Sequence, residues 1–331
     1  MKNSGQSVNK LAKFLGIADS GLLPPLALAP MAGVSDKAFR ALCKQHGCDY
    51  TITEMVSAKA LVYQDKKTVN LLGINDGEHP CAVQIFGSDP SCMAEAADKA
   101  LALSAANIID INMGCPTPKI VNNGDGSALM KAPELARDIV EHVVRAVKQP
   151  VTVKIRLGWD KGSINCVEFA KMLEQAGASA LAVHGRTRSM QYSGIADHDT
   201  IRLVKEAVSV PVWCNGDIRD GTTAKRALAI SRCDGLMIGR AAFGNPWLFA
   251  EIKAALAGEV APSLPSIQEI ANTVSQQFEM ARQHRGDKVA ILEMRKHFAW
   301  YLHGRPYMQE VKRKINAMQS AEDFYAIAKK L

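Results

Sequence analysis

The sequence lacks any apolar run long enough to cross a membrane, because its longest apolar stretches are strand-sized and end at glycine, proline or charge. Residues 1–20 also lack the continuous apolar core and the small-residue cleavage pattern of a secretory signal. With 331 residues, of which 47% are hydrophobic and 22% charged, the chain can bury one large core or two ordinary ones. These features predict a cytoplasmic globular protein with no membrane partner.

None of the eight cysteines belongs to a C-x-x-C pair, and several lie inside apolar runs, as Cys214 does. This scatter predicts reduced thiols and excludes both a disulfide framework and a zinc-finger type of site, so no metal is expected. Basic residues exceed acidic ones by 40 to 33, a formal net charge of +7, which alone is only a weak indication of a polyanionic partner.

Short β-rich runs alternate with helical patterns along most of the chain. We predict strands at 26–29, 50–53, 82–86, 108–112, 151–155, 181–184, 212–214 and 236–238. The helices expected between them cover 36–46, 91–102, 133–147, 167–175, 199–208 and 222–230. Strict alternation of this kind predicts a parallel sheet.

Nearly every predicted strand ends in polar or glycine-rich sequence. An open sheet needs such chemistry only near its switch point, whereas a barrel brings all strand ends to one cavity. The fold expected is therefore α/β, a (β/α)8 TIM barrel. The proline-rich segment 258–265 then leads to apolar spacing typical of a helical bundle. We predict an N-terminal extension at 1–20 that is mobile, a barrel at 21–258 and a helical domain at 259–331.

The loops after the last two strands carry Asn215-Gly216-Asp217 and Gly239-Arg240, where this architecture usually binds a phosphate. Glycines let backbone amides approach the phosphate, and Arg240 can pair with it. Ordinary tight turns are the alternative interpretation.

Lys154 and Arg156 are two residues apart on one strand, so both side chains face the same side, which we take to be the barrel interior. Buried cations need an anion or an electron-rich acceptor. A flavin ring would satisfy Lys154, and Gln84 could bind its polar rim. A structural ion pair with Glu54 or Asp110 is the alternative.

Cys115 follows a predicted strand and lies between glycine and proline, in the longest connection of the barrel. Mobile catalytic loops often occupy such places, and a thiol is mostly protonated at pH 7, so Cys115 is a candidate general acid. The alternative is that Cys115 is a small buried hydrophobic residue.

His184 ends another strand and is expected to contact the ligand. Arg186 and Arg188 are expected on the exposed lip of the barrel, where they are available to a polyanion.

These segments resemble the dihydrouridine synthases, flavoenzymes that reduce uridine in RNA, and among them the bacterial DusB-like branch. The matching segments are 29–36, 83–87, 110–116, 154–156, 184–188, 215–218, 238–240 and 295–297 with Trp300 and Tyr301. The resemblance implies FMN held by Pro30, Met31, Ala32, Gln84, Lys154, His184, Asn215, Gly216, Asp217, Gly239 and Arg240. It also implies a uracil near Asn112 and Arg156, hydride transfer from flavin N5 to C6, and a proton from Cys115 to C5. NADPH would supply the electrons.

Residues 281–314 hold nine basic against three acidic residues, a net charge of +6 beside Trp300, Tyr301 and Tyr307. We interpret this segment as a clamp for the tRNA backbone, with Arg295, Lys296, Lys312 and Arg313 as contacts. A solvated helix face is the alternative.

We expect a monomer without an obligate protein partner. Two rival functions stay open: a flavin barrel acting on a free pyrimidine such as dihydroorotate, and a catalytically silent RNA-binding protein.

Overall fold

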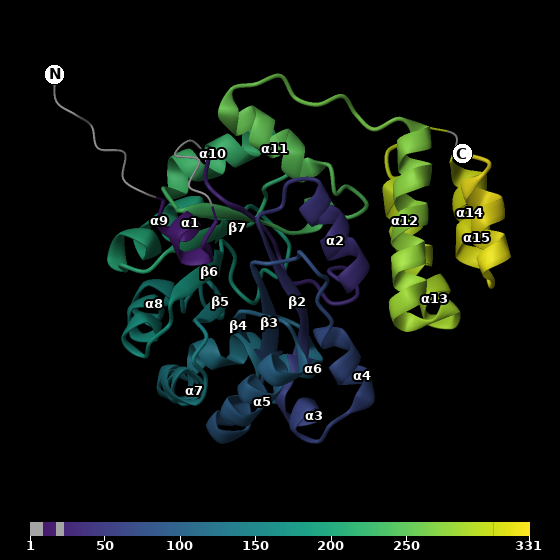
Figure 1. The fold of residues 1–331 in the computed structure, drawn as a ribbon. Coiled ribbons are helices and arrows are strands. Elements are labelled where there is room, and N and C mark those ends of the chain that lie inside the picture. Colours follow the sequence, from purple (N-terminus) through teal and green to yellow (C-terminus); the bar gives the residue numbers. More distant parts are fainter. Residues whose placement is uncertain (1–8, 18–22, 307) are drawn as a thin grey trace.

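Eight parallel strands form a closed barrel, with each strand hydrogen-bonded to its neighbours in sequence order and β1 to β8 (Figure 1). The computed structural model describes residues 9–17, 23–306 and 308–331. The strands are β1 (Leu26–Leu28), β2 (Tyr50–Ser57), β3 (Cys81–Phe86), β4 (Ile108–Met113), β5 (Val151–Arg156), β6 (Ala180–His184), β7 (Val212–Asn215) and β8 (Gly235–Ile238). The predicted (β/α)8 barrel is confirmed.

Helices cover the outside of the barrel, as the sequence predicts, and several short ones lie in the connections. The main outer helices are α2 (Lys37–Gln45), α5 (Pro90–Leu103), α7 (Pro133–Ala146), α8 (Cys166–Gln175), α9 (His198–Ala207), α10 (Gly221–Ser231) and α11 (Leu248–Ala257). After β1, the elements that the sequence did not predict are α3 (Ala58–Val62), α4 (Lys66–Val69), η1 (Asn70–Leu72), α6 (Pro118–Val121), η2 (Gly126–Lys131), η3 (Arg240–Ala242) and α11. Except for α11, they are only a few residues long, too short to show a periodic pattern.

The end of β2 lies further along the chain than predicted. The pairing register of β2 with β3 shifts between Ile52 and Met55, and such an irregularity interrupts the alternation by which a strand is recognised. The polar Glu54 falls inside this irregular part, which is why the sequence pattern ended the strand too early.

A short helix, α1 (Lys10–Leu15), closes the amino-terminal end of the barrel. Leu11 and Leu15 are buried there and join the cluster of interior side chains that includes Tyr50 and Trp213. Asn9 caps the helix and also donates from Nδ2 to the carbonyl of Asp234, 2.9 Å away. The expectation of a mobile extension therefore does not hold for residues 10–15, whereas residues 1–8 and 18–20 lie outside the described part.

Trp213 is buried and fills the barrel interior beside Tyr50. Its ring stacks on Tyr50 with centroids 5.7 Å apart and planes 13° from parallel. The neighbouring interior positions Ala27 and Ala182 are small, so the two large rings are accommodated. Gly235 is needed beside them, because a Cβ there would lie 2.7 Å from both Trp213 and Leu11.

The C-terminal part is a bundle of four helices with a core of its own, joined to α11 by the exposed segment 259–265 (Figure 1). The bundle contains α12 (Ile267–Arg285), α13 (Asp287–Tyr301), α14 (Gln309–Ala317) and α15 (Ala321–Ala328). Phe278 of α12 stacks on Phe324 of α15 at a centroid distance of 3.9 Å. Within the described residues, none of these or the other helices combines the length and apolarity needed to cross a membrane.

The bundle packs directly on the barrel beside α2 and the loop after β8. Phe243 of that loop contacts Trp300 of α13, with ring centroids 4.6 Å apart. Gly244 has to be glycine, because a Cβ there would overlap the backbone of Trp300 and Tyr301. Both aromatic residues therefore form the joint with the barrel rather than a free RNA surface, and Tyr307 lies outside the described residues.

We predict that Leu11→Ala lowers the free energy of unfolding by about 3 kcal/mol, because Leu11 is fully buried and truncation leaves a cavity in the barrel floor. Urea unfolding followed by circular dichroism measures the change. Lys13→Ala on the exposed side of the same helix is the control and should shift the midpoint little. A loss no larger than that of the control would mean that α1 does not close the barrel in solution.

Candidate functional site

A cavity of about 800 Å³ opens at the carboxyl ends of the strands. Its volume is in the range that binds cofactors and other small ligands. Most of the site residues expected from the sequence line it, namely Pro30, Met31, Ala32, Asn112, Cys115, Lys154, Arg156, His184, Asn215, Gly216, Asp217, Gly239 and Arg240. The register explains this convergence, because Arg156 pairs with His184 and His184 with Asn215 on adjacent strands.

Lys154 is held in the cavity by a neutral partner. Its Nζ donates to Oδ1 of Asn215 at 3.0 Å, and Nδ2 of Asn215 donates to the carbonyl of Met237 at 2.8 Å, which fixes the amide orientation. Within the described residues Lys154 has no carboxylate partner, so the alternative of an ion pair with Glu54 or Asp110 does not occur. Burial, and then the nearby Arg156, lower the pKa of Lys154 to about 8.

The guanidinium of Arg156 bridges two loops of the cavity rim. It donates to the carbonyls of Gly114 at 2.7 Å, Thr187 at 3.0 Å and Gln191 at 2.9 Å. Burial lowers its pKa to about 10, so Arg156 stays charged at neutral pH. Because carbonyls do not neutralise this charge, it adds to the positive potential of the cavity.

His184 is neutral at physiological pH. Burial first, and then the charges of Lys154, Arg156, Arg186 and Arg240, lower its pKa well below the ordinary value. Arg186 can only donate hydrogen bonds, so the Nε2 of His184, 3.4 Å from Arg186, is the accepting nitrogen. His184 therefore lines the cavity as a neutral imidazole, with Nδ1 as the protonated nitrogen.

The loop after β7 is built around the carboxylate of Asp217. It accepts from Arg186 at 2.6 Å and from the amide of Ala196 at 2.8 Å, and Arg240 lies 3.6 Å away. Burial would raise the pKa of Asp217, but these hydrogen bonds and charges outweigh it and lower the pKa. Gly216 has a φ of 122°, and a Cβ there would lie 2.8 Å from the Cβ of Ala196, so only glycine fits.

The loop that carries Cys115 is anchored on both sides. The carbonyl of Cys115 accepts from the Ser127 amide at 3.1 Å and from its hydroxyl at 2.8 Å. The amide of Cys115 donates to Oδ1 of Asn112 at 2.9 Å. The half-buried thiol lies 3.4 Å from the Thr117 hydroxyl and lines the cavity. Gly126, which has a φ of 60°, packs against this loop.

Gln84 lies below the cavity, where it forms part of a buried hydrogen-bond chain. Its Nε2 donates to Asp110 at 2.6 Å, and its Oε1 accepts from Asn112 at 2.9 Å. Burial raises the pKa of Asp110 to about 6, although hydrogen bonds from Thr152 and Gln84 oppose the shift. Gln84 is fully buried and does not line the cavity, so it orients Asn112, and through it the Cys115 loop.

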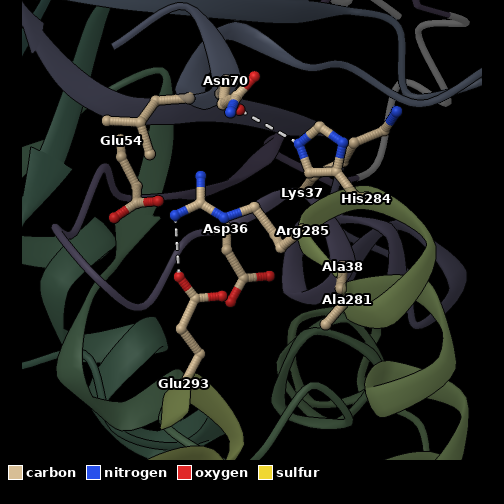
Figure 2. A pocket seen from close by; sticks show the side chains of 10 residues that line it. Asp36, Lys37, Ala38, Glu54, Asn70, Ala281, His284, Arg285 and Glu293 are labelled. Carbon is tan, nitrogen blue, oxygen red and sulfur yellow. Dashed lines mark hydrogen bonds and ion pairs between the residues drawn. The ribbon is translucent and has the colours of Figure 1, made fainter. Parts of the chain in front are cut away.

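A second, much smaller cavity of about 20 Å³ lies where the helical bundle meets the barrel (Figure 2). Figure 2 shows Asp36 and Glu54 of the barrel gathered around Arg285, which pairs with Glu293 at 3.1 Å. The carboxylate of Asp36 also lies 3.1 Å from Nε2 of His297 on α13. A space of this size holds about one water, so we interpret it as a charged joint and not as a ligand site.

Comparison with known families supports one assignment for this barrel. A family model described as "Dihydrouridine synthase (Dus)" matches residues 27–330. The chain belongs to the dihydrouridine synthase family. The tRNA-dihydrouridine synthase B of Pseudomonas aeruginosa is 44% identical over 299 residues, which cover 90% of this chain and 89% of that protein. The enzyme of the same name from Proteus vulgaris is 44% identical over 302 residues, covering 90% and 92%.

The resemblance based on sequence motifs is thus confirmed at the level of the family. A probable tRNA-dihydrouridine synthase of Rickettsia conorii is 41% identical over 306 residues and covers 92% of both chains. Among solved structures, histamine dehydrogenase from Rhizobium sp. 4-9 is similar with a TM-score of 0.54 and 13% identity, over 77% of this chain and 49% of that one. This last likeness supports the barrel fold alone.

Two arginines of this dihydrouridine synthase do not lie where the sequence suggested. Arg186 was expected on the exposed lip but is only 1% exposed, because Asp217 and the carbonyls of Ser193 and Gly194 bind it inside the loop. Arg295 was expected to contact RNA, but its Nε and one NH2 donate to the carbonyl of Met318 at 3.0 and 2.6 Å. The buried Arg186 stabilises the loop, whereas Arg295 is half-buried, and its contact with RNA stays a prediction.

Four further expected substrate contacts lie outside the cavity but are accessible. Lys296 is exposed on α13, and its ammonium group lies directly over Gly33 in the loop after β1. Arg313 is exposed and Lys312 half-buried on α14, and Arg188 is half-buried at the barrel rim. Within the described residues, none of these four cations pairs with a carboxylate, so their charge is available to a polyanion.

Sequence reasoning missed Ser127, Tyr192 and the pairing of Arg186 with Asp217. Ser127 directly follows the Gly-Asp-Gly segment, and its hydroxyl was not distinguishable from that of any other loop serine. Tyr192 lines the cavity, with the guanidinium of Arg240 4.7 Å from its ring centre. Its position after the His-Gly-Arg-Thr-Arg motif was the only signal that could have found it.

We predict that Asp217→Asn lowers the free energy of unfolding by about 3 kcal/mol, because Arg186 would stay buried without its counter-ion. Denaturant unfolding of the flavin-free protein measures the loss. Adding Arg186→Met should restore part of it, since the unpaired charge is then gone. Asp199→Asn on the surface of α9 is the control, as exposed pairs contribute little. Equal losses for the two aspartates would contradict the prediction.

Proposed function

We propose that this dihydrouridine synthase reduces specific uridines of tRNA to 5,6-dihydrouridine, with FMN as its bound flavin and NADPH as electron donor. One observation carries the proposal: an anion-attracting cavity of about 800 Å³ has Lys154 on its wall and the thiol of Cys115 at its rim. The names of the relatives that are more than 40% identical over most of the chain support tRNA as substrate.

The residues around the cavity fit an FMN molecule. The β7 and β8 loops offer Gly216, Gly239 and the half-exposed Arg240 for the phosphate. A side chain at Gly239 would extend toward Met31, whose sulfur lies 3.9 Å from the position of the added Cβ, and so into the space for a ligand. Lys154 and Asn215 are placed to hold the polar edge of the ring. Pro30, Met31, Ala32, His184 and Asp217 complete the proposed set, with Gln84 acting through Asn112.

Reduced FMN in this position would supply a hydride to C6 of the uracil. The protein supplies the proton: the Cys115 thiol donates it to C5 from the opposite face, and the thiolate that remains takes a proton from water. Cys115 is half-buried, so water reaches it, and Thr117 is close enough to hydrogen-bond the thiolate. In sum, one NADPH and one proton are consumed for each uridine reduced.

We propose that one set of residues contacts the target base and another set contacts the RNA backbone. The target base has to leave its stack to enter the cavity, where Asn112 and Arg156 would lie near it. Phosphate contacts outside the cavity would hold the RNA meanwhile, through Lys296, Lys312 and Arg313 of the helical bundle.

We predict that unmodified tRNA rapidly reoxidises the reduced flavoenzyme, whereas orotate does not, because a free pyrimidine makes none of the backbone contacts. Stopped-flow absorbance of the flavin measures both rates.

We predict that Cys115→Ala binds flavin and tRNA normally but forms almost no dihydrouridine, since no acid is then present to protonate C5. Cys92→Ala is the control, because that half-buried cysteine lies on α5, away from the cavity.

Rapid reoxidation by orotate and none by tRNA would replace the proposed function with that of an enzyme for free pyrimidines. A colourless purified protein would favour the silent RNA-binding alternative. Full turnover of Cys115→Ala would leave the substrate assignment intact and show that another group donates the proton.

We also predict that the affinity for FMN falls as the pH rises above about 8, the pKa to which burial lowers Lys154. The protonated ammonium binds the electron-rich ring edge, so deprotonation removes a contact and costs up to about tenfold in affinity per pH unit. Flavin fluorescence titration between pH 7 and 9.5 tests this. Lys154→Met should bind weakly at all pH values, while Lys148→Met, at the opposite end of the barrel, should behave as wild type. A flat wild-type profile would refute the role of Lys154.

A further inference from the structure

Three consecutive loops of the barrel rim form a cation cluster around one indole ring. Trp159 lies in the connection after β5, Lys131 at the end of η2 after β4, and Arg188 after β6. Nζ of Lys131 is 4.0 Å from the centre of the Trp159 ring, and Cζ of Arg188 is 4.4 Å from it. Cation–π contacts at this distance hold both cations beside the ring.

The two cations of this cluster keep their charge uncompensated. Within the described residues, neither Lys131 nor Arg188 pairs with a carboxylate, and Nε of Arg188 is buried without a hydrogen-bond partner. The acid next in sequence, Asp160, accepts instead from the amide of Gly162 at 3.0 Å and the hydroxyl of Ser163 at 2.8 Å. A guanidinium without acceptors is unfavourable, and because the Arg188 side chain is only half-buried, its outer nitrogens can donate to an external acceptor.

Backbone hydrogen bonds fix the loops that carry the cluster. The amide of Arg188 donates to the carbonyl of Gly158 at 2.9 Å, and that of Ser189 to the carbonyl of Trp159 at 2.9 Å. The side chain of Asn165 donates to the carbonyl of Met130 at 2.8 Å, which ties the end of η2 to the same loop. The cluster is therefore preorganised, which lowers the entropy cost of binding a ligand.

The cluster lies across the cavity mouth from the helical bundle. The bundle packs on the β8 loop and α2, next to β1, and β5 is four strands away from β1 in a closed barrel of eight. Arg156, which lines the cavity, precedes Trp159 by three residues. A polymer whose target residue enters the cavity extends from it in two directions, and the bundle covers only one of them.

We propose that Lys131, Trp159 and Arg188 form a second RNA site, which binds a backbone phosphate on the side of the target nucleotide away from the helical bundle. This inference rests on the proposed function. The phosphate takes the free donors of Arg188 and the charge of Lys131, while Trp159 keeps both in place without neutralising them, as a carboxylate would. The 2′-phosphate of NADPH offers the same chemistry, and the experiment separates the two sources.

The test compares tRNA binding by the flavin-loaded wild type and Lys131→Ala/Arg188→Ala over a salt series. Loss of both cations should weaken binding roughly tenfold and lower the slope of log K against log salt by about 1.5. The control is Lys148→Ala/Arg226→Ala, which removes two exposed cations away from the mouth and should bind as wild type. The single variant Lys131→Ala, at an exposed position, should lower the slope by about 0.8 even if the double variant folds poorly.

NADPH-driven flavin reduction, measured in the same variants, should be unchanged. If it falls while tRNA binding is retained, the cluster serves the donor and the proposal is wrong. Equal tRNA affinity and salt slope in the wild type and both cluster variants would also overturn it, with the proposed function intact. A wild type that binds no tRNA would overturn both.

Discussion

The site depends on buried cations that are held by neutral acceptors. Asn215 binds Lys154, and three backbone carbonyls bind Arg156, so neither charge is cancelled inside the barrel. The energetic cost of burying such charge is reduced when an anion or an electron-rich ring enters. Among the described residues, Asp217 is the carboxylate that lines the cavity, and it pairs with Arg186 and not with Lys154.

The same constraint organises the cysteine loop. Arg156 donates to the carbonyl of Gly114, next to Cys115, while Ser127 and Asn112 hold Cys115 itself from either side. A group that donates a proton must be held at a defined distance from its acceptor, and five hydrogen bonds to the loop provide that. The cavity wall and the proposed acid are thereby positioned by one connected set of bonds.

The helical bundle is part of this arrangement because it packs on the loops that line the cavity. Trp300 contacts Phe243, which lines the cavity, and Lys296 lies over Gly33 in the loop after β1. The carboxylate of Asp36 lies 3.1 Å from Nε2 of His297 at the same joint. The bundle and the mouth are thus fixed relative to each other, as recognition of a large substrate at a distance from the reacting base requires.

The sequence by itself determined the alternation of strands and helices, the polar strand ends and the loop cysteine, and with them the barrel and the family. These features are local, since a repeat of two or 3.6 residues records which face of an element is buried. Only the tertiary structure decided that Arg186 is buried, that Arg295 binds the Met318 carbonyl and that Gln84 contacts Asn112. Long side chains choose partners from segments far away in sequence, and no local period encodes that choice. For the same reason α1 was missed: its burial depends on the open barrel floor, which exists only after β1 and β8 have closed the sheet.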